Sequence, residues 1–294
     1  MLVGQVLNGL VNGAMYSLVA LGFTLIIGVL DKLNFTHPEI FMFGGFAGII
    51  SVNYLPAPWG LVVSFVVGGI LGLFTEWIAF RRFKSPDSKI TAALSSLALG
   101  LVFTDWVQKY WGTEPVSLPA LPSWMEQNVR IAEVEFPYLN FFILGVTCLL
   151  MITLHTLINK TRMGRQIRAV AESPTNASLL GIDVKKVSQV VFFISSGLAA
   201  EAGFLLSLRS ASANSEIGLT FGLKALAIMA IGGLGDMRGA MLGGLLIGVM
   251  EALLFVFGWG RWVEMTVWVV VIITMVIKPS GLFSARLKTQ EARA

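Results

Sequence analysis

Nine apolar runs follow one another along this 294-residue chain, most of them close to the ~20 residues that one membrane-spanning helix needs. They cover residues 3–30, 40–55, 59–80, 90–111, 138–158, 187–208, 218–235, 240–257 and 262–277. With 55% apolar and 13% charged residues, the chain has more hydrophobic surface than a soluble core could bury. Runs of this length predict helices rather than barrel strands, because backbone groups in hydrocarbon must bond within the segment. The sequence therefore predicts an all-α integral membrane protein, a polytopic bundle of eight or nine transmembrane helices.

The distribution of the 21 Lys and Arg residues indicates the orientation of this bundle. Short cytoplasmic loops retain positive charge, and the basic residues gather at 81–89, 160–186 and 278–293. Nine crossings place these clusters on the inside, with the C-terminus, and the N-terminus on the outside. The loop charges counted for the outside are Lys109, Arg130, Arg209, Lys224 and Arg261. Eight crossings remain an alternative in which one segment is re-entrant. The run at 218–235 is the weakest crossing because it carries Lys224.

Two polar connections are longer than the others. The connection at 112–137 is predicted to be an external loop and is rich in proline and glutamate. It is either a surface for a soluble partner or a solvated connection that caps helix ends. The connection at 161–182 is predicted to be cytoplasmic and to form two short helices. Ser173 and Pro174 have the order of a helix cap and a first helical residue, and Gly181 is placed to end the second helix.

The first of these two short helices is expected to be amphipathic. Arg165, Arg168 and Glu172 are spaced to share one face, while Ile167 and Val170 belong to an apolar face. Such a helix either docks a protein partner or lies on the lipid surface.

Polar residues inside the apolar runs are candidates for a solute path. Gln5, Asn8, Asn12 and Tyr16 share one face of the first run with glycines. They either line a watery path or bond to neighbouring helices. Glycines four residues apart, as at 9 and 13 or 244 and 248, are expected to let helices approach closely.

Two further polar features interrupt the apolar runs. Residues 34–39, which include Asn34, His37 and Glu39, form a polar break where unwound backbone could meet solute. Glu201 lies near the middle of its run, where a carboxylate is costly. It marks solute specificity or a subunit contact, or it is a neutral acid hydrogen-bonded inside the bundle.

No pattern of an enzyme is present. The sequence has no GxxxxGK[ST] loop for ATP phosphates, and its two histidines and single cysteine have no spacing for a nucleophile or a metal site. We therefore expect no catalytic residues, no metal and no cofactor on this chain, and we expect any ATP hydrolysis to come from another protein. The modest net charge of +4 fits positive-inside bias and anionic lipid and requires no nucleic acid.

Four stretches of the sequence are more specific than hydropathy. They are GLVNGAMYSLVALGFTLIIGVLDKLNFTHPEIFMFGGF at 9–46, EWIAFRRF at 76–83, TRMGRQIRAVAESPTNASLLGIDVKKV at 161–187 and FGLKALAIMAIGGLGDMRGAMLGGLLIGVMEAL at 221–253. Together they resemble the H-type permease subunit of branched-chain amino acid ABC transporters, within a superfamily that includes ribose-type sugar and urea or amide permeases. The chain departs from the family at Pro38, where members often have glycine, and at Glu201, where they usually have a small or apolar residue.

The resemblance implies one permease domain over residues 1–294 in a bacterial inner membrane. It implies a second, related permease subunit, two ABC ATPase subunits that hold ATP and magnesium, and a periplasmic solute-binding protein. The segment 161–182 would then contact the ATPase, through Arg162, Gly164, Arg165, Arg168, Ala169, Glu172, Leu180 and Gly181. The implied function is import of branched-chain or other neutral amino acids. Import of urea, short amides or sugars, or a stand-alone channel or proton-coupled carrier that titrates Glu201, are the alternatives.

Overall fold

The computed structural model describes residues 2–83, 88–118, 125, 127–131 and 134–283. Each apolar run of the sequence forms a helix, which confirms the all-α membrane fold. Among the described residues, seven helical segments are long and apolar enough to cross a membrane. They are α1 (Leu2–Leu30), α3 (Ala57–Thr75) continued by the π-helix η1 (Glu76–Phe80), α4 (Lys89–Trp111), α6 (Tyr138–Lys160), α9 (Val184–Ser210), α11 (Met237–Val256), and α12 (Val263–Ile277) preceded by the 3-10 turn η3 (Gly260–Trp262).

Helices α1 and α9 form the centre of the bundle. Helix α1 packs along α11, while α9 packs against α2 (His37–Val52) and α3. Along the α1–α11 contact, Gly9 and Gly13 face Gly244 and Gly248, so the two backbones approach closely, with the small side chains of Ser17 and Ala252 beside them. The predicted close approach at these glycines is confirmed.

The apolar helices α2 and α10 (Ile217–Gly232) are shorter than the others. Each has 16 residues, which gives about 24 Å at ~1.5 Å per residue, less than the ~30 Å hydrocarbon core of a bilayer. Both begin inside the bundle. His37 Nε2, at the start of α2, lies 3.3 Å from the Val19 carbonyl in the middle of α1. The chain therefore turns back beside α1 before α2 starts.

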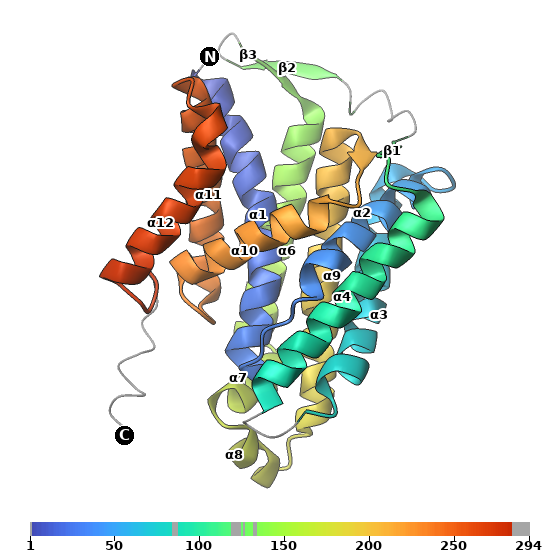
Figure 1. The fold of residues 1–294 in the computed structure, drawn as a ribbon, viewed down its shortest axis with the longest axis vertical. Coiled ribbons are helices and arrows are strands. Elements are labelled where there is room, and N and C mark those ends of the chain that lie inside the picture. Colours follow the sequence, from blue (N-terminus) through green and yellow to red (C-terminus); the bar gives the residue numbers. More distant parts are fainter. Residues whose placement is uncertain (1, 84–87, 119–124, 126, 132–133, 284–294) are drawn as a thin grey trace.

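The first turns of α2 and α10 meet. Pro38, in the first turn of α2, packs against Gly218 and Gly222 of α10, where an added Cβ would collide with it. Figure 1 shows α10 crossing the bundle at a steep tilt in front of α1. The predicted polar break at 34–39 is thus the connection that carries the chain from the end of α1 to this meeting point.

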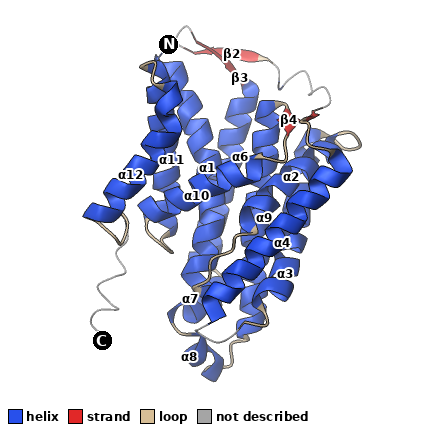
Figure 2. Ribbon diagram, viewed as in Figure 1, coloured by secondary structure: helices blue, strands red, loops and turns tan. Residues whose placement is uncertain are grey.

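The two ends of the bundle differ. At one end, β1 (Val116–Ser117) pairs antiparallel with β4 (Ser212–Ala213), and β2 (Asn128–Ile131) pairs antiparallel with β3 (Val134–Pro137). Figure 2 shows the strands at the same end as the start of α1, while α7 (Arg162–Glu172) and α8 (Pro174–Leu179) lie at the opposite end. The segments predicted to be external and cytoplasmic thus lie at opposite ends. Residues 119–124, 126 and 132–133 of the predicted external loop, and the basic tail at 284–294, lie outside the described residues.

Candidate functional site

Helix α7 is fixed to the bundle by its apolar face. Its first turn is capped by Thr161, whose Oγ1 accepts a hydrogen bond from the Gly164 backbone N–H at 3.0 Å. Ile167 and Val170 are buried, and Gly164 packs against the last turn of α6 so closely that a Cβ would collide with the Ile158 carbonyl. Helix α7 contacts α1, α6, α8 and α9. Since this apolar face is buried against protein, it is not free to lie on lipid.

The outer face of α7 carries the predicted charges, with one exception. Arg162, Arg165 and Glu172 are exposed and Ala169 is partly buried. Arg168 is also partly buried, and its guanidinium donates a hydrogen bond to the Ile158 carbonyl at the end of α6. It therefore joins α6 to α7, while Arg165 and Glu172, which were predicted to share its face, are exposed.

Helix α8 presents an apolar tip. Ser173 Oγ accepts a hydrogen bond from the Asn176 backbone N–H at 3.2 Å, and Gly181 follows the helix with φ +80°, which confirms the predicted helix–turn–helix. Leu179 and Leu180 are 81% and 80% exposed. Both leucines are thus left uncovered by the rest of the described chain.

The next helix, α9, starts from a capped end. Asp183 Oδ1 accepts hydrogen bonds from the backbone N–H groups of Lys185 and Lys186 at 3.1 and 3.2 Å. The Lys186 N–H is the main reason that the pKa of Asp183 lies below its ordinary value. An ionised cap at this helix N-terminus fixes the point where the α7–α8 segment rejoins the bundle.

The polar face of α1 is largely occupied by bonds to other helices. Asn8 Oδ1 accepts a hydrogen bond from Arg209 Nη2 at 3.1 Å, and Asn12 accepts another from the same guanidinium. Tyr16 donates to Glu251 Oε2 at 2.8 Å. Gln5 is exposed. Of the two interpretations of this face, interhelical bonding describes Asn8, Asn12 and Tyr16.

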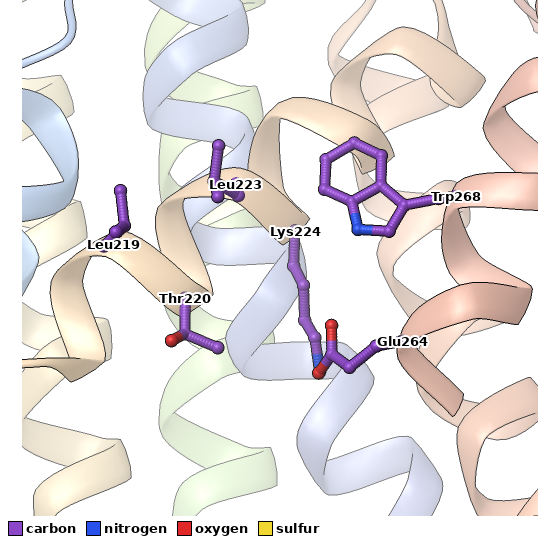
Figure 3. Close-up of a pocket in the computed structure, with 6 residues that line it drawn as sticks. All are labelled: Leu219, Thr220, Leu223, Lys224, Glu264 and Trp268. Atoms are coloured by element: carbon purple, nitrogen blue, oxygen red, sulfur yellow. The ribbon is translucent and has the colours of Figure 1, made fainter. Parts of the chain in front are cut away.

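A buried ion cluster lies beside Tyr16. Lys224 of α10, which is 8% exposed, has its Nζ 3.0 Å from Glu251 Oε1 of α11 and 2.7 Å from Glu264 Oε1 of α12. Figure 3 shows the lysine side chain extending to the Glu264 carboxylate, with Trp268 of α12 nearby. The cluster ties three helices together, and Tyr16 connects it to a fourth.

The ion cluster opens into a groove of about 380 Å³ between α10 and α12. Its lining consists of the cluster residues Lys224 and Glu264 together with Leu219, Thr220, Leu223 and Trp268. Sequence reasoning missed this site because it counted Lys224 and Arg209 as loop charges. The available signal was the cost of an intramembrane cation, which requires an acidic partner on a neighbouring helix.

The residues of the 34–39 break bond to partners other than the ion cluster. Asn34 Oδ1 accepts a hydrogen bond from the Thr36 backbone N–H at 3.1 Å. The buried His37 ring lies 4.4 Å from the ring of Phe23, centroid to centroid. Glu39 Oε2 accepts a hydrogen bond from Thr104 Oγ1 of α4 at 2.8 Å. Side-chain bonds thus fix the start of α2 in the bundle.

Glu201 is a buried carboxyl group on α9. It is 6% exposed, and its Oε2 has no hydrogen-bond partner within the described part of the chain. The bonded acid that the sequence suggested is therefore not found for this oxygen.

Comparison with known proteins identifies the family. The family model for the permease component of branched-chain amino acid transport systems matches residues 5–277. The permease LivH of a high-affinity branched-chain amino acid transport system in Salmonella typhimurium is 30% identical over 290 residues, which cover 95% of this chain and 94% of LivH. The corresponding BraD of Pseudomonas aeruginosa is 30% identical, with 95% and 94% covered. The fructose import permease FruG of Bifidobacterium longum is 23% identical, with 76% and 67% covered. The chain belongs to the family of branched-chain amino acid transport permeases, a family whose relatives extend to sugar permeases.

Proposed function

We propose that this protein is a transmembrane subunit of an ABC importer that moves branched-chain or other neutral amino acids across the bacterial inner membrane. The solute class is supported by the names of LivH and BraD, which match the chain almost end to end. Two separate ATPase subunits bind ATP and magnesium, a second related permease completes the membrane portion, and a periplasmic binding protein delivers the solute. The N-terminus is periplasmic and the C-terminus cytoplasmic, in keeping with the basic clusters on one side.

The observation that carries this proposal is the construction of the α7–α8 segment. Its inner face is locked onto α1, α6 and α9, while Arg165, Leu179 and Leu180 are exposed at its outer surface. A partner bound there can move α7 only by moving the ends of the central helices. ATP-driven closure of the ATPases would therefore rock the bundle and expose the path alternately to the two sides.

The first experiment isolates the complex gently from its native membrane and identifies the bound proteins by mass spectrometry. We expect an ABC ATPase, a second permease and a solute-binding protein, whose ligand then names the solute. Recovery of the chain alone, together with solute exchange by the chain alone in liposomes, would contradict the importer and support a channel or carrier. A binding protein that holds urea, an amide or a sugar would correct the solute class.

Single variants test the docking surface itself. Arg165→Glu and Leu179→Asp should each leave membrane insertion intact and remove the ATPase from the purified complex. Both side chains are exposed, and neither makes a hydrogen bond or an ion pair among the described residues. The matched control is Lys109→Glu, an exposed charge at the end of α4 away from α7 and α8, which should keep the ATPase. Normal ATPase recovery with both α7–α8 variants would exclude this surface as the docking site.

A further inference from the structure

The groove between α10 and α12 combines three kinds of chemistry. Lys224 supplies an ammonium group at its base, and Glu264 supplies a carboxylate whose side chain is 60% exposed. Leu219, Leu223 and Trp268, all exposed, supply an apolar wall. The volume of about 380 Å³ lies in the range of small-molecule sites, which is roughly 300–1,000 Å³.

The exposed charge of Glu264 is difficult to explain by contact with lipid. A carboxylate facing hydrocarbon is costly, so charged residues in membrane helices generally face the bundle interior or water. Glu264 stands in the first turn of α12, yet its carboxylate is directed at Lys224 across the groove. The groove can therefore be reached from water at this end of α12.

The groove offers one charge of each sign to a ligand. Lys224 is shared between Glu251 and Glu264, and the Glu264 side chain is 60% exposed while that of Lys224 is 10% exposed. A ligand with a single charge could pair with only one of Lys224 and Glu264. A zwitterion brings one charge of each sign and can pair with both.

We propose that the α10–α12 groove is a transient binding site for a zwitterionic amino acid with an apolar side chain. The solute carboxylate takes the place of Glu264 at the Lys224 ammonium, and the solute ammonium binds the Glu264 carboxylate that is released. Glu251 stays bonded to Lys224 and to Tyr16, so the lysine remains anchored during the exchange. The apolar side chain lies against Leu223 and Trp268. This site rests on the proposed amino-acid transport function and places a solute contact on this chain.

Protection of a cysteine in the groove tests the site in the complete transport complex reconstituted in nanodiscs. The single native Cys148, which is exposed, is first replaced by serine, and Thr220→Cys then places a thiol on the groove wall. We expect L-leucine to slow the reaction of this thiol with a water-soluble maleimide. Isoamylamine, which lacks the carboxylate, and 4-methylpentanoate, which lacks the ammonium, should need a concentration roughly thirtyfold higher or more for the same protection. Tyr54→Cys, an exposed position in the turn after α2, is the control and should show no protection.

Two charge variants assign the effect to the ion pair. Lys224→Met in the Thr220→Cys background should abolish protection by L-leucine. Glu264→Gln should do the same, and it keeps the folded bundle because its side chain is largely exposed and Lys224 retains Glu251. Glu216→Gln, an exposed carboxylate just before α10, should leave protection unchanged.

The outcomes separate this site from the transport function. If the same complex imports leucine into liposomes while L-leucine gives no protection in the groove, the site is refuted and the proposed function stands. Equal protection by L-leucine and the single-charge analogues refutes the zwitterion pairing. If the complex imports another solute and no neutral amino acid, the proposed solute fails, and the site fails with it.

Discussion

A single methyl group added at Gly13 should measurably weaken the bundle. The Cβ of Gly13→Ala would lie 2.8 Å from the Gly244 carbonyl oxygen and 2.8 Å from Leu245 Cα, both of them backbone atoms of α11. No side chain can rotate away to relieve this overlap. Ordinary contact begins near 3.4 Å, so α1 and α11 must separate by about 0.6 Å along their contact.

That separation would also loosen neighbouring contacts. Gly9 packs against Gly248 and Ala252 one turn earlier, and Ser17 Oγ donates a hydrogen bond to the Met241 carbonyl of α11 at 2.8 Å. Overpacking of a close contact typically costs about 1–3 kcal/mol. We expect Gly13→Ala to lower the free energy of unfolding by about that amount.

Gly145→Ala on α6 is the matched control. Apart from the backbone of its own helix, no atom of the described residues lies within 4 Å of a Cβ at this position, and alanine in a helix interior is favoured over glycine by about 0.5–1 kcal/mol. The two variants should therefore shift the midpoint of thermal unfolding in opposite directions, measured on the purified chain in one detergent. An unchanged or raised midpoint for Gly13→Ala, under conditions where Gly145→Ala behaves as expected, would refute the backbone contact between α1 and α11.

Three further substitutions test individual interactions. Thr161→Ala removes the cap of α7 and should destabilise that helix by about 1 kcal/mol; faster amide hydrogen exchange in residues 162–166 would show it, and unchanged exchange would argue against the cap. Tyr16→Phe removes the hydrogen bond to Glu251 and should cost about 1.5–3 kcal/mol of stability, seen as a lower unfolding midpoint; a midpoint equal to that of the unaltered chain would contradict this bond. Glu201→Gln should keep or raise the unfolding midpoint, because the buried Oε2 has no partner among the described residues and a neutral amide is less costly to bury than an ion; a lowered midpoint would show that the carboxylate makes a stabilising contact.

The helices could be predicted because hydrocarbon leaves the backbone almost no other choice. Every apolar run became a helix, and the local signals at Ser173, Pro174 and Gly181 gave the α7–α8 turn correctly. The short lengths of α2 and α10 were harder to predict from the sequence. Whether an apolar run of 16 residues spans the bilayer depends on where the chain enters it. For α2 that entry point is set by the contacts of His37 with α1 and of Pro38 with α10, which only the folded bundle defines.

The candidate sites differ in how much of each could be predicted from the sequence. The charged face of α7 follows from helical spacing, but the bond from Arg168 to the Ile158 carbonyl depends on the angle at which α7 leaves α6. The polar face of α1 was equally visible, since Asn8, Asn12 and Tyr16 recur with the helical period. Its partners lie about 200 residues or more further along the chain, and no local pattern links such distant positions.

The ion cluster shows that the same basic residue can be used to predict the membrane orientation or to predict a buried site. The positive-inside rule treats each Lys or Arg as a loop residue, so assigning Lys224 and Arg209 to the external side removed them from the search for buried charges. A lysine within an apolar run has a second explanation, an acidic partner on another run, and Glu251 and Glu264 were available to supply it. Because a paired intramembrane cation contributes to packing and little to orientation, such residues are better excluded from the charge count and searched for partners first. With Lys224 and Arg209 set aside, the three basic clusters still predict the orientation of this chain. A search for the acidic partners of Lys224 then leads to the groove between α10 and α12.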